Sequence, residues 1–322
     1  MLDEGTIDLP DAAWDAVREL GSLTLHRNTP HDDDGAIRDR CQEADVVLTN
    51  KVPLRREVIA KAPRLRLIST LATGYNIVDV EAASDHGVTV CNVPGYSTPA
   101  MAQHTLALIL ELTNRVGLHA EAVRGGAWTR SEFYYFLERP VVELAGRTVG
   151  LVGFGEIAGA VGRLVSALGA SVLAFRRHPG EPPPYGPFAW ATSVDQVFEE
   201  ADVVSLHCPL TPETDRLVDA ARLARMKPTA CLVNTARGGL VVERDLVAAL
   251  RARGIAGAAL DVVAEEPMRP DSPLLGEVPN LIVTPHNGWA TEASRRRLLK
   301  QTAENIRQFL RGTPVNVVGC GA

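Results

Sequence analysis

Short apolar runs rich in Val, Ile and Leu alternate with helix-like segments along almost the whole chain. Strands of a parallel sheet have near-continuous apolar runs of this kind, because helices cover both faces of the sheet. The pattern therefore predicts an α/β protein with doubly wound parallel sheets. The expected strands fall into two groups, which predicts two domains.

The first group occupies the first third of the chain. It comprises expected strands at 44–49, 65–70 and 88–92 and expected helices at 55–61 and 80–86. Residues 1–7 would add at most a short strand at a frayed sheet edge. A helix at 292–311, with Leu298, Leu299, Ile306 and Leu310 as an apolar stripe among charges, is expected to return to this domain.

The second group is larger and follows a strongly apolar helix at 101–112. Ser97-Thr98-Pro99 is a typical start for this helix, with a hydroxyl to cap the free amides and Pro at the first helical position. Six strands are expected, at 148–152, 171–175, 203–207, 231–234, 257–261 and 281–284. The domain boundaries are therefore expected near residues 98 and 290.

Composition and charge narrow the class of partner. The 322 residues are 46% hydrophobic and 22% charged, with a net charge of −6, so no basic field favours nucleic acid. No run approaches the roughly 20 apolar residues of a membrane span, and the acidic start lacks the features of a signal peptide. We expect a cytoplasmic protein with a small-molecule partner, no nucleic acid and no membrane.

The five cysteines favour neither a metal site nor a disulfide framework, because no Cys-x-x-Cys pair occurs; they are Cys41, Cys91, Cys208, Cys231 and Cys320. Most are expected to be small buried hydrophobes. His207 precedes Cys208 in sequence, but adjacent strand residues point to opposite faces, so a Cys–His nucleophile is not expected. The metal prediction is none.

A glycine-rich turn is the first candidate for chemistry. Gly153-x-Gly155-x-x-Ala158 directly follows an apolar strand and opens a helix at 156–168, the setting in which the dinucleotide fingerprint is meaningful. Gly153 would allow the tight turn, and Gly155 would let the backbone approach a pyrophosphate at the helix N-terminus. The alternative is a strand-to-helix turn that binds nothing.

The strand after this helix ends in Arg176-Arg177, where a dinucleotide fold commonly has an acidic residue for the adenosine ribose. Guanidinium groups can pair with a 2′-phosphate, and each charge-assisted bond contributes about 1.5 to 3 kcal/mol. We therefore expect NADP(H) as the preferred cofactor, with NAD(H) as the alternative. Two solvated arginines at a strand end are the other interpretation.

Three ionisable residues follow strands of the second group, where open α/β sheets bind ligands. Arg237 could hold the carboxylate and 2-oxygen of a keto acid. His286 as imidazolium is a suitable proton donor near neutral pH, and a carboxylate from Glu266 beside it would favour that charged form. Each residue alone is more often structural. Together they predict reduction of a 2-keto acid.

The chain also resembles the D-isomer-specific 2-hydroxyacid dehydrogenase family over nearly its full length. The motifs are Val152-Gly153-Phe154-Gly155, Cys208-Pro209-Leu210-Thr211-Pro212, Val233-Asn234-Thr235-Ala236-Arg237-Gly238, Ala259-Leu260-Asp261-Val262 with Glu266-Pro267, and Thr284-Pro285-His286. Leu48 to Lys51, Ala72 to Asn76 and Thr284 to Trp289 look most like glycerate dehydrogenases, also called hydroxypyruvate or glyoxylate reductases.

The resemblance implies a Rossmann cofactor domain, residues 99–289, inserted into a flavodoxin-like substrate domain, residues 1–98 and 290–322. It implies that Arg237 binds substrate, that His286 is the acid/base and that Glu266 orients it. The implied substrate residues are Lys51, Thr73, Gly74 and Trp289. The residues expected to bind the cofactor, from the motifs, the two arginines and the resemblance together, are Gly153, Phe154, Gly155, Glu156, Ile157, Arg176, Arg177, His207, Cys208, Pro209, Thr214, Thr235, Ala236, Asp261, His286 and Gly288.

Some positions depart from the family pattern. Arg176 replaces the usual aspartate, Ala158 the third glycine and Gln103 the common glutamate. Residues 128–139, with four consecutive aromatics, resemble the family's intersubunit arm, so a homodimer through the cofactor domain is expected. Two alternatives stay open: a dinucleotide-sensing regulatory protein of the same fold without turnover, and a formate or phosphite dehydrogenase.

Overall fold

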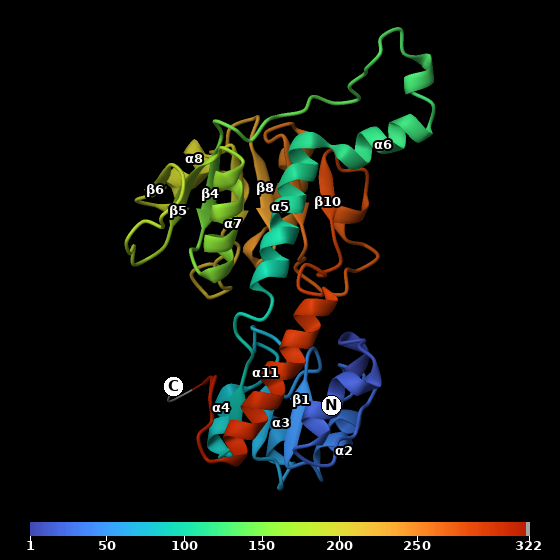
Figure 1. Cartoon of the computed structure of the whole chain (residues 1–322), viewed down its shortest axis with the longest axis vertical. Helices are drawn as coiled ribbons and strands as arrows, with labels where there is room; N and C mark the ends of the chain where they lie inside the picture. Colours follow the sequence, from blue (N-terminus) through green and yellow to red (C-terminus); the bar gives the residue numbers. More distant parts are fainter. Residues whose placement is uncertain (320–322) are drawn as a thin grey trace. The chain divides into compact units, whose positions relative to one another are not determined.

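The computed structural model describes residues 1–319 and divides into two compact units (Figure 1). Unit 1 holds residues 1–97 together with the described residues from Trp289 onward, and unit 2 holds residues 98–288. Each division falls one residue before the boundary expected from sequence. Trp289 therefore belongs to unit 1, where its ring packs edge-on against Tyr96 with the centroids 6.4 Å apart. Cys320 lies outside the described residues.

Unit 1 contains a three-stranded parallel sheet in the order β1-β2-β3. Its elements are η1 (Glu4–Thr6), η2 (Asp11–Trp14), α1 (Asp15–Arg18), α2 (Asp34–Cys41), β1 (Val46–Thr49), α3 (Arg56–Ala60), β2 (Leu67–Thr70), α4 (Val80–Asp85), β3 (Thr89–Cys91) and α11 (Glu292–Leu310). Alternate strand residues face two cores, as the period of a strand requires. Val47 packs with α2, α3 and α4, and Leu48 packs with α11.

Residues 1–7 form no regular strand, which agrees with the expectation of at most a short one. Leu2 N donates to Leu48 O at 2.9 Å, whereas Glu4 N and Gly5 N donate to His26 O and Arg27 O, and Glu4–Thr6 form a 3-10 helix. One expectation for unit 1 was wrong. In α11, Leu298, Leu299 and Ile306 are buried as expected. Leu310, at the last turn of the helix, is 55% exposed.

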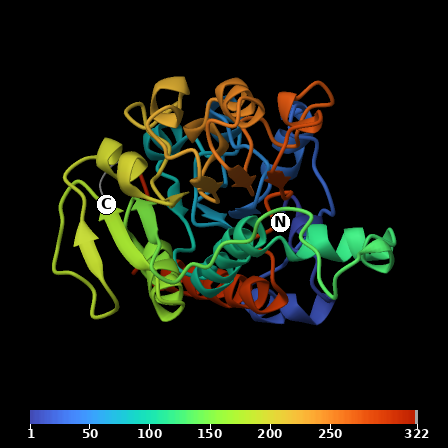
Figure 2. The ribbon, with the colours of Figure 1, turned by 90° about the horizontal axis from the view of Figure 1, so that it is seen from above.

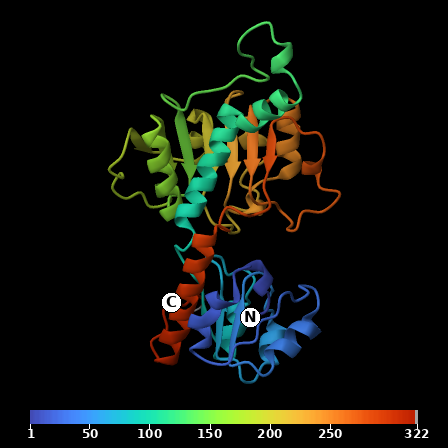
Figure 3. The same cartoon turned by 45° about the vertical axis from the view of Figure 1, so that its right-hand side comes forward.

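Unit 2 contains a seven-stranded, wholly parallel sheet in the order β10-β9-β8-β7-β4-β5-β6 (Figure 3). Its strands are β4 (Thr148–Val152), β5 (Ser171–Phe175), β6 (Phe188–Trp190), β7 (Val203–Leu206), β8 (Cys231–Asn234), β9 (Gly257–Leu260) and β10 (Leu281–Val283). Six of these were expected. The seventh, β6, was missed, and it pairs with β5 at the sheet edge.

Helices cover both faces of this sheet, which is the doubly wound arrangement expected. The helical elements of unit 2 are α5 (Thr98–Asn114), α6 (Val116–Arg124), η3 (Trp128–Arg130), α7 (Glu156–Ala167), α8 (Val194–Glu200), α9 (Ala220–Leu223), η4 (Gly238–Leu240), α10 (Glu243–Arg251) and η5 (Pro273–Leu275). One core lies between the sheet and α5 and α7, and a second lies between the sheet and α8, α9 and α10.

The strand order reverses at β4, which lies between β5 and β7. The chain runs from β4 outward to β5 and β6 and then crosses back to β7. Open α/β sheets bind ligands at the carboxyl ends of the strands beside such a reversal. Gly153 and His207, which directly follow β4 and β7, stand at this point.

The segment from α6 to about residue 143 projects from unit 2 (Figure 2). It returns where Val142 N donates to Thr113 O at 2.9 Å. It carries large exposed apolar side chains, including Phe133 at 70% and Tyr134 at 88% exposure. We call residues 125–141 the arm. No helix among the described residues 1–319 combines the length and apolar character needed to cross a membrane.

Candidate active site

The turn after β4 depends on a glycine. Gly153 has φ +88°, and a Cβ there would lie 2.6 Å from Cys208 N and 2.7 Å from His207 C. Both the left-handed backbone and the close approach of the chain after β7 therefore exclude a side chain. The β4–α7 turn and the β7 loop are held against each other at the reversal of the sheet.

Gly155 fits an approach by a ligand's phosphates. It is the N-cap of α7, no side chain caps that helix end, and a Cβ on Gly155 would meet nothing within 4 Å. Uncapped amides at the N-terminus of a helix favour an anion. Glu156 and Ile157 open the helix beside this open space. The turn therefore suits a dinucleotide pyrophosphate.

The two arginines after β5 differ in their surroundings. Both are exposed, but Arg177 Nη2 lies 3.6 Å from Glu213 Oε2, while Arg176 forms no ion pair within residues 1–319. A hydrogen bond from Thr211 Oγ1 and the Arg177 charge hold the pKa of Glu213 below its usual range. A 2′-phosphate would have to compete with Glu213 for Arg177, whereas Arg176 offers its guanidinium without that competition.

The loop after β7 is built around Thr214. Its hydroxyl accepts from Thr211 N at 2.8 Å and donates to Pro209 O at 2.6 Å, so it fixes the Pro209 turn. His207 Nε2 lies 2.9 Å from Ser205 Oγ, and burial lowers the pKa of His207 to about 4. His207 is thus neutral at physiological pH and unsuited to donate a proton in catalysis.

The described cysteines have no nucleophilic character. Burial raises the pKa of the thiols to about 11 in each case, at Cys41, Cys91, Cys208 and Cys231. A thiol nucleophile needs a lowered pKa, so these side chains pack as small hydrophobes. Within residues 1–319 no group of three or more His, Cys, Asp or Glu side chains is arranged to hold a metal ion.

Arg237 follows β8 on a backbone fixed by Asn234. The Asn234 side chain accepts from Ala236 N at 3.0 Å and donates to Arg237 O at 2.8 Å. Thr235 is buried and bonded to Thr105 Oγ1 at 3.0 Å. Arg237 itself is half-buried, and its Nη1 donates to Ala236 O at 2.7 Å, which leaves the other guanidinium donors for a ligand.

The loop that carries Glu266 packs directly on the residue after Arg237. A Cβ on Gly238 would lie 1.9 Å from Val263 O, so only glycine fits there. Glu243, in the first turn of α10, accepts from Ala264 N at 2.7 Å and secures the same loop. The backbone thereby links the position of Arg237 to that of Glu266.

His286 and Glu266 form a direct pair. His286 Nδ1 lies 2.6 Å from Glu266 Oε2, with the two side chains 28% and 35% exposed, and Glu266 Oε1 accepts from Val263 N at 3.1 Å. The carboxylate fixes the ring orientation and holds Nδ1. Nε2 of His286 has no hydrogen-bond partner among the described residues. Nε2 is therefore the ring atom that can serve a substrate.

Asp261 and Gly288 also meet at this edge. The Asp261 side chain is wholly buried, and its Oδ2 accepts from Gly288 N at 3.0 Å. Burial favours the neutral acid, but hydrogen bonds from His104, Thr284 and Gly288 outweigh it, so the pKa of Asp261 lies below its usual value. The carboxylate is charged at neutral pH and acts as a fixed acceptor.

The expected substrate residues Lys51, Thr73, Gly74 and Trp289 all lie in unit 1. Asp3, which the sequence analysis did not single out, accepts from Lys51 N at 2.6 Å and from Asn50 N at 2.9 Å. The Thr73 loop is held by Asn92, whose amide donates to Thr73 O at 2.7 Å. Side chains of unit 1 thus hold the backbone of both loops.

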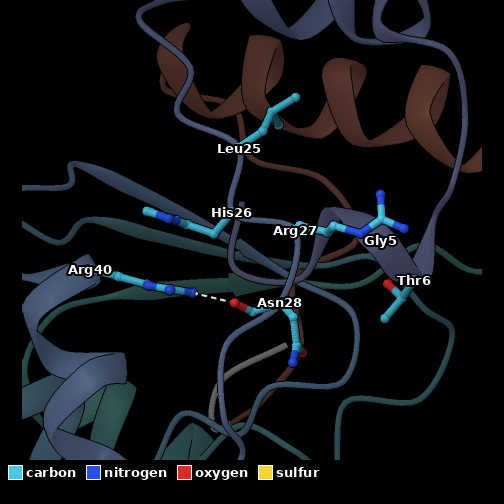
Figure 4. A pocket seen from close by; sticks show the side chains of 7 residues that line it. All are labelled: Gly5, Thr6, Leu25, His26, Arg27, Asn28 and Arg40. Atoms are coloured by element: carbon cyan, nitrogen blue, oxygen red, sulfur yellow. Dashed lines mark hydrogen bonds between the residues drawn. The ribbon is translucent and has the colours of Figure 1, made fainter.

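A hollow of about 690 Å³ in unit 1 is lined by Gly5, Thr6, Leu25, His26, Arg27, Asn28 and Arg40 (Figure 4). Its basic side chains do not converge: His26 and Arg27 point in opposite directions. Arg40 Nη1 donates to Asn28 O at 2.7 Å. The hollow therefore has no arrangement that would hold one ligand.

Comparison with known proteins agrees with this geometry. Residues 106–288 match the family described as D-isomer specific 2-hydroxyacid dehydrogenase, NAD binding domain. The chain is 40% identical over 318 residues to a hydroxypyruvate reductase of Blautia hydrogenotrophica, covering 99% of this chain and 98% of the relative. The chain belongs to the D-isomer-specific 2-hydroxyacid dehydrogenase family.

Solved structures support the same conclusion. A protein from Thermus thermophilus superposes with a TM-score of 0.87 at 39% identity, over 97% of each chain. An NADPH-dependent glyoxylate/hydroxypyruvate reductase from Sinorhizobium meliloti superposes with a TM-score of 0.83 at 26% identity, over 97% of this chain and 96% of that one. The predicted family, α/β fold and NAD(P)-dependent oxidoreductase class are confirmed.

Proposed function

We propose that this dehydrogenase reduces glyoxylate or hydroxypyruvate to the D-2-hydroxy acid, with NADP(H) preferred over NAD(H). The observation that carries the proposal is the 2.6 Å pair between His286 Nδ1 and Glu266 at the carboxyl edge of a dinucleotide-binding sheet. Arg237 stands after a neighbouring strand of the same sheet. The similarity to hydroxypyruvate and glyoxylate reductases supports this substrate class.

Each of the three residues has a distinct task. Arg237 would hold the substrate carboxylate and polarise the 2-oxygen, since its guanidinium offers parallel donors. His286 Nε2 would deliver a proton to that oxygen as it becomes an alcohol. Glu266 would stabilise the imidazolium and keep Nε2 directed at the substrate. In the reverse direction His286 would take the proton back.

The cofactor would be held by the turn at Gly153, Phe154 and Gly155 and by the first amides of α7 at Glu156 and Ile157. When bound, a nicotinamide dinucleotide supplies the hydride for reduction. The loops after β7, β8 and β9 complete the proposed set. They contribute His207, Cys208, Pro209, Thr214, Thr235, Ala236, Asp261 and Gly288. Lys51, Thr73, Gly74 and Trp289 stay predictions for substrate contact.

The preference for NADPH would come mainly from Arg176. It is exposed at the end of β5 and, unlike Arg177, does not pair with Glu213. Arg176→Ala should raise KM for NADPH about tenfold and leave KM for NADH unchanged, because one screened charge-assisted bond to phosphate contributes about 1.4 kcal/mol. Arg177→Ala should have the smaller effect. Arg163→Ala, another exposed arginine on α7, is the matched control.

The decisive experiment measures oxidation of NADPH and of NADH with glyoxylate, hydroxypyruvate, pyruvate and a bulky 2-keto acid. The highest kcat/KM is expected for NADPH with glyoxylate or hydroxypyruvate. A higher kcat/KM for a bulky acid would refute the substrate class, and equal values for the two cofactors would refute the preference. Tight NADPH binding without turnover of any keto acid would instead indicate a regulatory role.

We also propose that the enzyme is a homodimer formed through unit 2. The arm exposes Phe133, Tyr134, Tyr135 and Leu137, each at least 55% accessible in the single chain. Contiguous exposed apolar side chains of this kind are typical of interaction surfaces. A cytoplasmic location stays a prediction from the sequence.

A further inference from the structure

A second histidine, His104, stands behind the Glu266–His286 pair. It lies on α5, and its Nε2 is 3.2 Å from Asp261 Oδ1 and 3.2 Å from Thr284 Oγ1. Thr284 uses its own hydroxyl hydrogen to bond Asp261 Oδ1 at 2.6 Å. The Nε2 hydrogen of His104 is therefore the donor to both oxygens. The His104 side chain is 21% exposed, so this contact is largely shielded from water.

The acceptors of His104 hold the chain on both sides of His286. Asp261 Oδ1 accepts from Asn287 N at 3.1 Å, and Oδ2 accepts from Gly288 N at 3.0 Å. The backbone oxygen of Asp261 accepts from His286 N at 2.8 Å. One buried aspartate thus bonds to residues 284, 286, 287 and 288, and His104 is the side chain that anchors it from the helix.

The backbone after His286 also packs against the His104 ring. A Cβ on Gly288 would lie 2.8 Å from His104 Cδ2, 3.0 Å from Asp261 Oδ2 and 3.1 Å from Met101 Sδ. This position therefore has room only for glycine. The turn has no space to shift toward α5 while the imidazole is present.

His286 needs such support because its backbone is in the left-handed region, with φ +52°. A non-glycine residue there costs about 1 to 2 kcal/mol, and the surrounding contacts must compensate for it. Hydrogen bonds to the flanking residues supply that compensation. A displacement of about 1 Å of a reacting group can cost about a hundredfold in rate.

We infer that His104 is a positioning residue, which acts through Asp261 and Thr284 to fix the 284–288 turn and thereby the place of His286 Nε2. The inference rests on the proposed role of His286 in proton transfer. It assigns to α5 a function that neither the glycine turn nor the Glu266–His286 pair provides. His104 itself touches neither reacting atom in this account.

Two substitutions separate positioning from general packing. His104→Leu fills the space without a donor, and His104→Gln restores an N–H near the position of Nε2. Thr113→Val is the matched control, because it removes a buried side-chain hydrogen bond on the same helix. Thr113 lies at the C-terminal end of α5 and makes no hydrogen bond to Asp261 or Thr284. We expect His104→Leu to lower kcat about 10- to 100-fold, as for other residues that orient an active group. His104→Gln should recover most of this loss.

The Thr113→Val control should keep the kcat and the dissociation constant for NADPH of the parent within about twofold. Combining His104→Leu with Thr284→Val should cost no more than the larger single effect, because both changes release the same turn. A kcat of His104→Leu within about twofold of the parent enzyme would overturn the inference. Equal losses in the Leu and Gln variants would overturn it as well.

Hydrogen exchange gives a readout that does not depend on turnover. The amides of 286–288 should exchange faster in His104→Leu than in the parent or in Thr113→Val. Unchanged exchange would refute the positioning role even if the proposed substrate were correct. A parent enzyme that fails to reduce any keto acid but shows the exchange effect would refute the proposed function alone.

Discussion

At the scale of single residues, the pairing of Glu266 with His286 makes a prediction about turnover. The Glu266 carboxylate lies 2.6 Å from Nδ1 and so fixes the orientation of the ring that the proposed proton transfer uses. Glu266→Gln keeps the length of the side chain but removes the charged acceptor. It should therefore lower kcat for keto-acid reduction about 10- to 100-fold, which steady-state kinetics would measure.

A neighbouring residue provides the control for this experiment. Glu265→Gln removes an adjacent carboxylate whose partner is Arg269, 3.7 Å away, and not His286. Its kcat should match that of the parent enzyme. If Glu266→Gln and Glu265→Gln lower kcat equally, or neither lowers it, Glu266 has no specific role in proton transfer.

At Gly238, any side chain would collide with the loop that carries Glu266. A Cβ there would lie 1.9 Å from Val263 O, a backbone atom that cannot swing aside. Gly238→Ala should displace the loop that carries Glu266, lower kcat at least about tenfold and cost about 1 to 3 kcal/mol of stability. Steady-state kinetics and thermal melting would measure both losses.

The adjacent glycine tests whether the backbone contact is the cause. A Cβ on Gly239 would lie 2.9 Å from Leu210 Cδ2, the end of a flexible side chain. Gly239→Ala should therefore lose clearly less activity and stability than Gly238→Ala. The reverse order would mean that the contact with Val263 does not set the position of the Glu266 loop.

At the scale of elements, the edge strand β6 supports the cofactor turn from the side. Phe154, inside the glycine turn, packs edge-on against Phe188 and Trp190, with centroid separations of 5.5 and 5.1 Å. Trp190 Nε1 also donates to Gly180 O at 2.9 Å, which ties down the loop after Arg176 and Arg177. The strand thus braces both the turn and the arginine segment.

This arrangement predicts a binding defect without a defect in chemistry. Aromatic pairs contribute about 0.5 to 1.5 kcal/mol beyond their buried area. Trp190→Leu should raise the dissociation constant for NADPH about 2- to 10-fold, with kcat unchanged, as fluorescence titration and saturating kinetics would show. Trp190→Phe keeps the ring contacts and should lose less. Equal losses in both variants would mean that the ring contact with Phe154 is unimportant for cofactor binding.

The strands also show which elements can be predicted from the sequence and which cannot. Strands of four or five residues with a largely apolar and buried run, such as β4 and β8, are predictable from that run alone. β6 was missed because it has only three residues, lies at a sheet edge and follows a Pro- and Gly-rich loop. The detailed conformation of residues 1–7 could not be predicted, because the amides of Glu4 and Gly5 bond to residues 26 and 27, a pairing that no local pattern indicates.

In the candidate site, too, some residues could be predicted from the sequence and others could not. Arg237, Glu266 and His286 could be predicted because each follows a strand of one parallel sheet, and strand ends meet at one edge. His104 could not, because its partner Thr284 is 180 residues away in sequence. Asp3 was missed for a similar reason, since its acceptor role joins residues 47 and 48 positions apart. Polar contacts between residues that are far apart in sequence can be recognised only once the fold is known.

At the scale of the whole molecule, the arm makes a prediction about assembly. Phe133 and Tyr134 are 70% and 88% exposed on a segment that projects from unit 2 (Figure 2). Replacing both with Ser removes apolar area that a partner chain would bury, at about 25 cal/mol per Å². Sedimentation should give twice the 34.6 kDa chain mass for the parent protein and a shift toward 34.6 kDa for the double variant.

A control outside the arm decides whether the effect is specific. Leu310 is 55% exposed in unit 1, so Leu310→Ser removes exposed apolar area of a similar kind without touching the arm. That variant should sediment like the parent. A parent protein that is monomeric at tens of micromolar would contradict the dimer, and equal dissociation of the Leu310→Ser variant would place the interface elsewhere. Because Arg237, Glu266 and His286 all lie within one chain's unit 2, the monomeric arm variant should still lose turnover on Glu266→Gln.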